Sequence, residues 1–239
     1  MTERLQAIGD VETVEPLAAL GVRAFTTTRA SGDFGFHSTE PSREVIARWT
    51  ALRRELGRDG IRFATAGQVH GARVAVHAPG GSGWLRVDDA DGHAAVDRGT
   101  AMAVVTADCV PVFVAHPAGA SGILHAGWRG TAAGILSRGI AALATRGFDP
   151  REFIVHLGPA ICCQCYEVGA DVYSQLTGRT IEGKAHVDLR ELLAREATAA
   201  GVQRVTVSES CTRCDNDRFF SHRAGDGQRQ VSLVVAGLL

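Results

Sequence analysis

In the stretch Met102-Ala-Val-Val-Thr-Ala-Asp-Cys-Val-Pro-Val-Phe-Val114, apolar and β-branched residues follow one another almost without a break. A run of this kind predicts strands that are buried on both faces. It is interrupted by Thr106-Ala-Asp-Cys109-Val-Pro111, and proline is disfavoured inside a central strand. The stretch therefore predicts two buried strands, or one strand that is broken beside a site.

Strands and helices are mixed on both sides of this stretch. Apolar, β-branched runs predict further strands at Val22–Thr27, Gly122–His125, Phe153–Leu157, Val205–Ser208 and Val231–Ala236. Helical spacing predicts helices at Val45–Leu56, Gly130–Thr145 and Asp188–Ala200, the last capped by its own aspartate. Because the strict alternation of strand and helix is missing, we expect a mixed α/β (α+β) fold, layered as a sandwich with a central mixed sheet.

Length and charge limit the possible classes of protein. With 239 residues, of which 45% are hydrophobic, the chain can bury the core of a single domain spanning residues 1–239. A formal net charge of −1 argues against a nucleic-acid partner. The start, Met1 to Asp10, lacks a signal-peptide pattern, and no apolar run is long enough to span a membrane. We expect a cytoplasmic protein without nucleic-acid or membrane partners, as a monomer or a weak homo-oligomer.

Three segments each place a potential metal ligand at the end of a predicted strand. They are Gln68-Val-His70-Gly71, Thr106-Ala-Asp-Cys109-Val-Pro111 and His125-Ala-Gly-Trp-Arg-Gly-Thr131. Two imidazoles and one thiolate suit zinc, and three protein ligands leave a fourth position for water or substrate, as in catalytic sites. Taken singly, a histidine beside apolar residues is more often a core residue, and a cysteine in an apolar run is more often a small hydrophobic one.

These segments, together with Asp89-Ala-Asp91-Gly92, resemble the signature of the laccase-domain family. Its members are also called multicopper polyphenol oxidases, purine nucleoside phosphorylases and peptidoglycan editing factors. The resemblance extends from Phe25-Thr-Thr-Thr-Arg29 to Phe219-Phe-Ser-His-Arg223. Two departures concern substrate preference: Ser31-Gly-Asp-Phe-Gly-Phe-His37 stands where such proteins usually carry Asn-Leu-Gly, and His222 replaces the usual tyrosine.

The resemblance implies an α/β/β/α-type sandwich and a zinc ion held by His70, Cys109 and His125, with copper as the second candidate metal. It also implies phosphorolysis of purine nucleosides such as inosine and adenosine. Adenosine deamination and methylthioadenosine phosphorolysis would be companion activities. The expected small-molecule partners are therefore a nucleoside and phosphate.

Further site residues are expected around this metal site. The turn Gly127-Trp-Arg-Gly130 before a helix is a candidate anion site, because small residues expose backbone N–H groups and Arg129 adds a cation. A surface salt bridge is the ordinary alternative for Arg129. Asp91 is a candidate catalytic residue that orients a histidine or acts as general acid/base, and a role in a turn is equally compatible with its position. The expected substrate-binding residues are Arg29, Gln68, Asp108 and Arg129.

The other cysteines allow two interpretations. Cys162, Cys163 and Cys165, with the pair Cys211 and Cys214, have the ligand types of a second, closed zinc site. The family resemblance includes only Cys165 and Cys211, so ordinary buried thiols are favoured.

Four functions fit these residues. The first is a zinc-dependent nucleoside enzyme. The second is a copper-dependent phenol oxidase, ranked lower because the nine histidines do not form the His-x-His pairs of a trinuclear copper cluster. The third is metal-free chemistry on an amide of a cell-wall precursor, with Cys109 as nucleophile and His125 or His70 as the catalytic base. The fourth is a non-catalytic domain that keeps zinc for stability.

Overall fold

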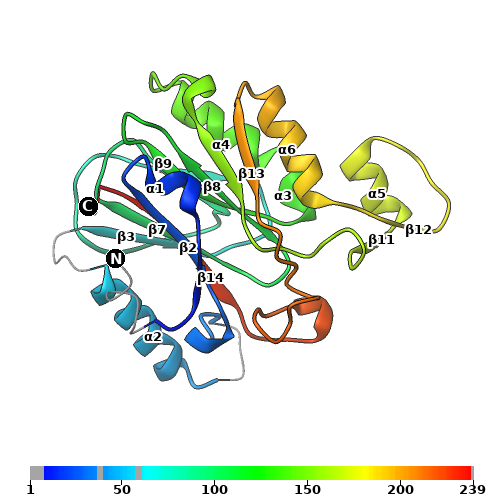
Figure 1. Ribbon diagram of the computed structural model, residues 1–239, viewed down its shortest axis with the longest axis horizontal. Coiled ribbons are helices and arrows are strands. Elements are labelled where there is room, and N and C mark those ends of the chain that lie inside the picture. The colour runs from blue at the N-terminus through cyan, green and yellow to red at the C-terminus, as the bar shows by residue number, and fades with distance from the viewer. Residues whose placement is uncertain (1–7, 37–39, 57–60, 238–239) are drawn as a thin grey trace.

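Two six-stranded mixed sheets pack face to face in the computed structural model, which describes residues 8–36, 40–56 and 61–237 (Figure 1). The first sheet has the order β1 (Val11–Thr13), β2 (Val22–Thr27), β14 (Gln230–Ala236), β7 (Thr100–Thr106), β3 (Arg62–Ala66) and β5 (Gly83–Val87). The second has the order β13 (Arg204–Val207), β10 (Ile154–Leu157), β8 (Val110–Ala115), β9 (Ser121–Ala126), β6 (Gly92–Ala95) and β4 (Val74–His77). Expectations that rest on residues 1–7 and on His37 lie outside the described residues.

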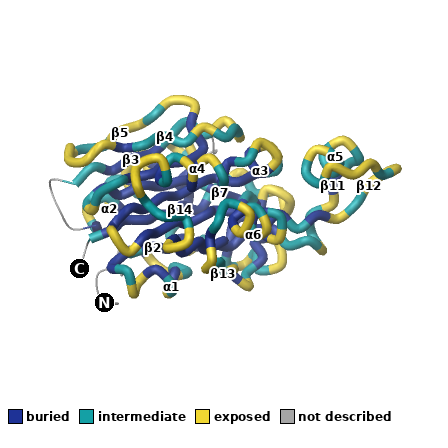
Figure 2. Tube along the Cα trace, turned by 90° about the horizontal axis from the view of Figure 1, so that it is seen from above, coloured by how far each residue is buried: buried dark blue, intermediate teal, exposed yellow. Residues whose placement is uncertain are grey.

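Helices cover the outer faces of both sheets, which confirms the layered α/β/β/α sandwich. Helix α2 (Ser42–Glu55) lies on the first sheet, whereas α4 (Ile135–Ala144) and α6 (Leu189–Ala199) lie on the second (Figure 1). Two short helices, α1 (Glu15–Ala18) and α3 (Trp128–Ala132), flank the sheets. Helix α5 (Ala170–Thr177) and the hairpin of β11 (Glu167–Gly169) and β12 (Lys184–His186) project from one end (Figure 2).

Three apolar layers hold these four layers of structure together. Between the sheets, buried side chains include Met102, Phe113, Ile123 and Val234. The layer between α2 and the first sheet includes Phe25, Trp49, Phe63 and Leu233, and the layer between α4, α6 and the second sheet includes Val112, Leu124, Leu136 and Leu193. Both faces of the central strands are therefore covered, which explains why their sequences are continuously apolar (Figure 2).

The stretch Met102–Val114 forms two strands, and they belong to different sheets. β7 lies in the first sheet and β8 in the second, so the turn at residues 107–109 crosses from one sheet to the other. The polar residues of this turn therefore do not have to pair with a neighbouring strand in either sheet. The crossing puts Asp108 and Cys109 where the two sheets meet.

Other predicted elements are present with small changes. β2, β9, β10, β13 and β14 lie where strands were expected, and α6 is capped by Asp188, whose carboxylate accepts the N–H of Glu191 at 3.0 Å. The single helix expected at Gly130–Thr145 is wrong. It is split into α3 and α4 because Gly134 between them has φ 73°, a left-handed conformation that ends one helix. Within the described ranges, no helix is both long and apolar enough to cross a membrane.

Candidate metal centre and substrate pocket

Cys109 is presented by the turn that links the two sheets. Asp108, which precedes it, has φ 85°, and aspartate is among the few non-glycine residues that tolerate this region. The Asp108 carboxylate accepts hydrogen bonds from Thr212 Oγ1 and from the backbone N–H of Arg223, both at 2.7 Å. Asp108 therefore joins the turn to the C-terminal segment and holds Cys109 in place.

His125 lies near the end of β9, beside β8, and its side chain is buried. Its Nδ1 is 2.9 Å from Oδ1 of Asp91, a carboxylate with no exposed surface. This contact uses one ring nitrogen and leaves Nε2 for another ligand, as is common for metal-binding histidines.

The same carboxylate also shapes the loop that carries His70. Backbone N–H groups of Val69, His70 and Gly71 donate to Asp91 at 3.2, 2.9 and 2.7 Å. They hold His70 at φ 60°, a conformation that is uncommon for a non-glycine residue. Asp91 therefore positions two of the candidate metal ligands, and it is not among the residues that line the pocket described below.

The structure brings His70, Cys109 and His125 together, with their ligand atoms all within 4.8 Å of one another. Gly127 leaves room for this set, since a Cβ there would lie 2.9 Å from Sγ of Cys109 and 3.3 Å from the ring of His70. Two imidazoles and a thiol at such distances fit a zinc ion with three protein ligands.

Electrostatics also favour a metal-binding thiolate. Burial raises the pKa of Cys109, but the charge of His125 and hydrogen bonds from His125 and His70 outweigh it and lower the pKa to about 6. Burial lowers the pKa of His125, while the Cys109 thiolate and Asp91 raise it to about 9. Both shifts favour the charged form of their group, so the surroundings of this pair favour a thiolate at Cys109.

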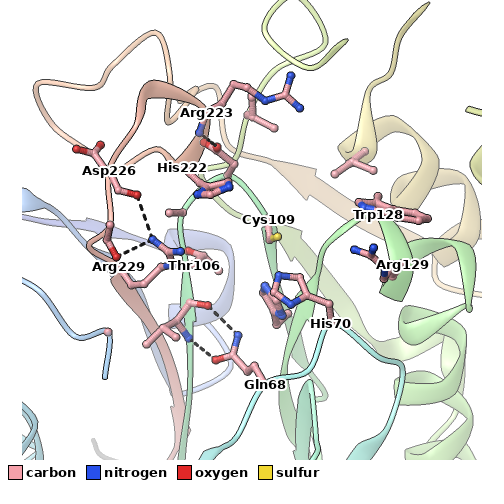
Figure 3. A pocket seen from close by; sticks show the side chains of 18 of the residues that line it. Gln68, His70, Thr106, Cys109, Trp128, Arg129, His222, Arg223, Asp226 and Arg229 are labelled. Atoms are coloured by element: carbon pink, nitrogen blue, oxygen red, sulfur yellow. Dashed lines mark hydrogen bonds between the residues drawn. The ribbon is translucent and has the colours of Figure 1, made fainter. Parts of the chain in front are cut away.

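A pocket of about 810 Å³ opens beside these three residues (Figure 3). Volumes of 300–1,000 Å³ are usual for small-molecule sites. The polar and aromatic residues on its wall, besides the three candidate ligands, come from segments far apart in the sequence: Phe36, Gln68, Arg86, Thr106, Asp108, Trp128, Arg129, Tyr166, His222, Arg223, Asp226 and Arg229. The pocket therefore combines a candidate metal site with cationic and aromatic side chains.

The cations on the pocket wall differ in their partners. Arg223 donates to the carbonyl of Glu167 at 3.0 Å, and Arg229 donates to the carbonyl of Gln228 at 2.7 Å. The guanidinium of Arg129 lies over the ring of Trp128 at 4.2 Å, and that of Arg86 lies over Phe36 at 5.6 Å. Within the described part of the chain, neither Arg86 nor Arg129 has a hydrogen bond or an ion pair. Both guanidinium groups keep their donors for a ligand.

Three of the expected substrate-binding residues have structural partners: Asp108, as described above, and also Gln68 and Arg29. Gln68 lines the pocket, but its amide group bonds both the N–H and the carbonyl of Val105 at 2.8 Å, which anchors its loop to β7 (Figure 3). The structure does not bring Arg29 into the pocket lining. Its guanidinium pairs with Asp226, bonds the carbonyl of Phe219 at 3.1 Å and lies over the ring of Phe220. Arg29 therefore fastens the segment that delivers the C-terminal pocket residues.

Sequence reasoning missed most of the pocket wall. His222 and Arg223 lie in the quoted Phe219–Arg223 segment, so the family resemblance carried a signal for them. Tyr166 follows Cys165, which the family resemblance includes, and burial together with the charge of Cys109 raises the pKa of Tyr166 to about 12. Its hydroxyl keeps its proton and can donate a hydrogen bond. Nothing in the local sequence of Arg86 or Arg229 indicates a site.

The turn Gly127–Gly130, the candidate anion site, precedes a helix that is shorter than expected. Gly127 is the N-cap of α3, which has five residues. Gly130 is required by close packing, since a Cβ there would lie 2.8 Å from the carbonyl oxygen of Gly71. Both glycines of this turn are therefore required by close packing, Gly127 against the candidate metal ligands and Gly130 against the backbone of Gly71. Arg129, which lies between them in the sequence, lines the pocket.

Comparisons with known proteins agree with this fold. The family model described as multi-copper polyphenol oxidoreductase laccase matches residues 21–236. The chain belongs to this family. A purine nucleoside phosphorylase of Mycobacterium tuberculosis is 34% identical over 231 residues, which are 89% of this chain and 91% of that protein. Another, from Deinococcus radiodurans, is 34% identical over 230 residues, covering 89% and 87%.

Solved structures show the same architecture. The crystal structure of the hypothetical protein YfiH from Bacillus licheniformis matches with a TM-score of 0.85 and 26% identity, covering 98% of both chains. That of YlmD from Geobacillus stearothermophilus matches with a TM-score of 0.82 and 29% identity, covering 93% of this chain and 94% of the other. The resemblance found in the sequence motifs is confirmed.

Proposed function

We propose that this protein is a zinc-dependent purine nucleoside phosphorylase. The observation that carries the proposal is one pocket in which the set His70, Cys109 and His125 shares a wall with Arg129. Relatives that cover about nine tenths of the chain bear the name of this activity. The family description suggests metal binding, and zinc is the metal that best suits two imidazoles and a thiolate with an open fourth position.

Phosphorolysis transfers the ribosyl group to phosphate. A phosphate oxygen bonds to C1′ of ribose while the bond from C1′ to the purine nitrogen breaks, and the purine leaves with the electron pair and takes up a proton. A zinc ion held by His70, Cys109 and His125 would supply a Lewis acid that polarises an oxygen in the pocket.

The protein's own groups position the reactants. Arg129 and Arg86 offer guanidinium donors to the phosphate, because charge-assisted bonds to phosphate oxygens are strong and directional. Trp128 and Tyr166 present apolar faces to the base and ribose, and the protonated Tyr166 hydroxyl can donate to an acceptor on either. Asp91 fixes the orientation of His125, and Asp108 holds the Cys109 turn.

The test uses protein purified without added metal. We expect bound zinc, and conversion of inosine to hypoxanthine and ribose 1-phosphate only when phosphate is present. Release of free ribose without phosphate would contradict phosphorolysis. Adenosine and methylthioadenosine are run in parallel, with ammonia release reporting the deamination that we propose as a companion activity.

Two other reactions remain as named outcomes of the same test. The family description favours phenol oxidation, and two imidazoles with a thiolate also bind copper. Within the described residues, the one other candidate ligand cluster consists of four cysteines, which is unsuited to a trinuclear copper centre. Phenol oxidation that requires copper and oxygen, without nucleoside cleavage, would replace the proposal. Metal-independent hydrolysis of an amide of a cell-wall precursor would instead assign Cys109 as a nucleophile, a role that its lowered pKa permits.

A further inference from the structure

A second group of potential metal ligands lies where β10 and β13 end. These strands are parallel neighbours, so the segments that follow them leave the sheet at the same edge. Each segment carries a Cys-x-x-Cys pair, Cys162 with Cys165 and Cys211 with Cys214. The backbone sets their register, because Ala160 and Cys211 form a parallel bridge and Thr212 N–H donates to the carbonyl of Ala160 at 3.2 Å.

The four sulfur atoms form a compact cluster. All lie within 4.8 Å of one another, with Sγ of Cys214 3.5 Å from that of Cys165 and 4.0 Å from that of Cys162. Tetrahedral zinc with Zn–S bonds of about 2.3 Å places its sulfur ligands about 3.8 Å apart. The cluster is therefore close to the size that four thiolate ligands need, without rearrangement of the backbone.

Backbone amides independently point to a negative charge on one of these sulfurs. The N–H groups of Cys162 and Cys214 donate to Sγ of Cys211 at 3.2 and 3.4 Å. The N–H of Cys211 donates to the carboxylate of Asp215 at 3.0 Å, which holds the turn closed. Amides directed at sulfur stabilise a thiolate over a thiol, as expected for a metal ligand.

These four cysteines are not ordinary buried thiols, because most of them are partly or fully exposed. Cys211 is buried, but Cys162 and Cys165 are partly exposed and Cys214 is exposed. Cys163 lies in the same turn and is not part of the four-cysteine cluster. The selection of four of five neighbouring cysteines matches two Cys-x-x-Cys pairs, which is a pattern of structural zinc sites.

We propose that Cys162, Cys165, Cys211 and Cys214 bind a second zinc ion in a closed structural site. Four protein ligands leave no open position, so this ion takes no part in catalysis. Its role is to clamp together two loops beside the pocket, one that lines it and one that supports the Cys109 turn. Tyr166 follows Cys165 directly, and Thr212, which follows Cys211, donates to Asp108 beside the Cys109 turn.

The two metal sites can be counted separately in the full chain. We expect two zinc ions per chain in the wild type and one in Cys109→Ala, which removes a ligand of the pocket site only. Cobalt added to the metal-free Cys109→Ala protein should produce the intense visible bands of tetrahedral tetrathiolate coordination. Cys163→Ser is the matched control and should keep both ions.

Cys214→Ser removes the most exposed ligand of the four-cysteine site and leaves the ligands of the pocket site unchanged. We expect at least a tenfold loss of affinity for one of the two zinc ions in chelator competition, with the pocket ion retained. If this variant does not fold, the cobalt spectrum of Cys109→Ala decides. A Cys109→Ala protein that binds neither zinc nor cobalt would overturn the proposal. So would an intact mass showing a disulfide among the four cysteines of freshly purified protein.

Discussion

Nδ1 of His125 lies 2.9 Å from Oδ1 of Asp91, and that same oxygen accepts the backbone N–H of His70, also at 2.9 Å. One buried carboxylate therefore sets the positions of two candidate zinc ligands that are 55 residues apart in the sequence numbering (125 − 70). The third ligand, Cys109, is positioned independently through Asp108. The pocket site is thus supported by two aspartates that do not themselves occupy ligand positions.

Asp91→Asn should weaken zinc binding in the pocket by about 10–100-fold, the usual effect of losing a partner behind a metal-binding histidine. The amide keeps the shape of the carboxylate but loses its charge and one acceptor oxygen. Competition with a chromophoric chelator measures the affinity. Asp88→Asn is the control, because Asp88 is exposed nearby, and equal affinities in the two variants would refute the role of Asp91.

Gly127→Ala should exclude zinc from the pocket while the protein stays folded. The added Cβ would lie 2.9 Å from Sγ of Cys109, closer than atoms normally approach. Metal analysis and circular dichroism check the two parts of this expectation. Gly227→Ala is the matched control, since a Cβ at this pocket residue meets nothing within 4 Å. Full zinc occupancy in Gly127→Ala would mean that the metal does not use Cys109.

Arg129→Ala should raise the KM for phosphate about tenfold or more and change the KM for inosine less. Hydrogen bonds to charged groups contribute roughly 1.5–3 kcal/mol, and the loss falls on the ligand that the arginine contacts. Initial rates at varied phosphate and fixed inosine give this comparison.

Arg29→Ala provides the contrast. Because Arg29 is not among the lining residues and its guanidinium pairs with Asp226, its loss should lower the midpoint of thermal unfolding and leave the KM for phosphate nearly unchanged. If Arg29→Ala impaired phosphate use as strongly as Arg129→Ala, phosphate would have to bind elsewhere.

His93 should make the folded state less stable in acid. Burial, followed by the charge of His77, lowers the pKa of His93 from 6.5 to about 3. Between these values the unfolded chain binds a proton that the folded chain does not. The free energy of unfolding should therefore fall by about 1.4 kcal/mol per pH unit from this group as the pH drops from 6.5 towards 3. Urea unfolding of wild type and His93→Gln measures the difference in slope, and equal slopes would contradict the assignment.

Sequence patterns predicted where the strands lie in the chain better than which strands pair with one another. The apolar run from Met102 to Val114 predicted two buried strands or one strand broken beside a site, and the first of these alternatives is present as β7 and β8. It could not show that β7 and β8 lie in different sheets, because both faces of each strand are apolar and alternation is lost. The break at Gly134 was missed because a glycine within helical spacing is often tolerated.

For the site, local sequence indicated residue types but not their long-range partners. His70, Cys109 and His125 were singled out by motif, and the structure places them together. Arg29 and Arg129 looked alike as cations, and only the fold shows that Arg29 is engaged by Asp226, 197 residues away. The two Cys-x-x-Cys pairs were visible in the sequence, but their proximity depends on the parallel pairing of β10 and β13.

Strand β14 is the last strand of the described residues, yet it lies inside its sheet between β2 and β7. During synthesis on a ribosome, β2 and β7 emerge long before β14, so the strand that pairs with both of them is still missing from the sheet. The segment that brings His222, Arg223 and Arg229 to the pocket comes just before this strand. The pocket wall and the first sheet are therefore completed by the same late event, and a nascent chain cannot acquire a finished pocket before β14 has left the exit tunnel.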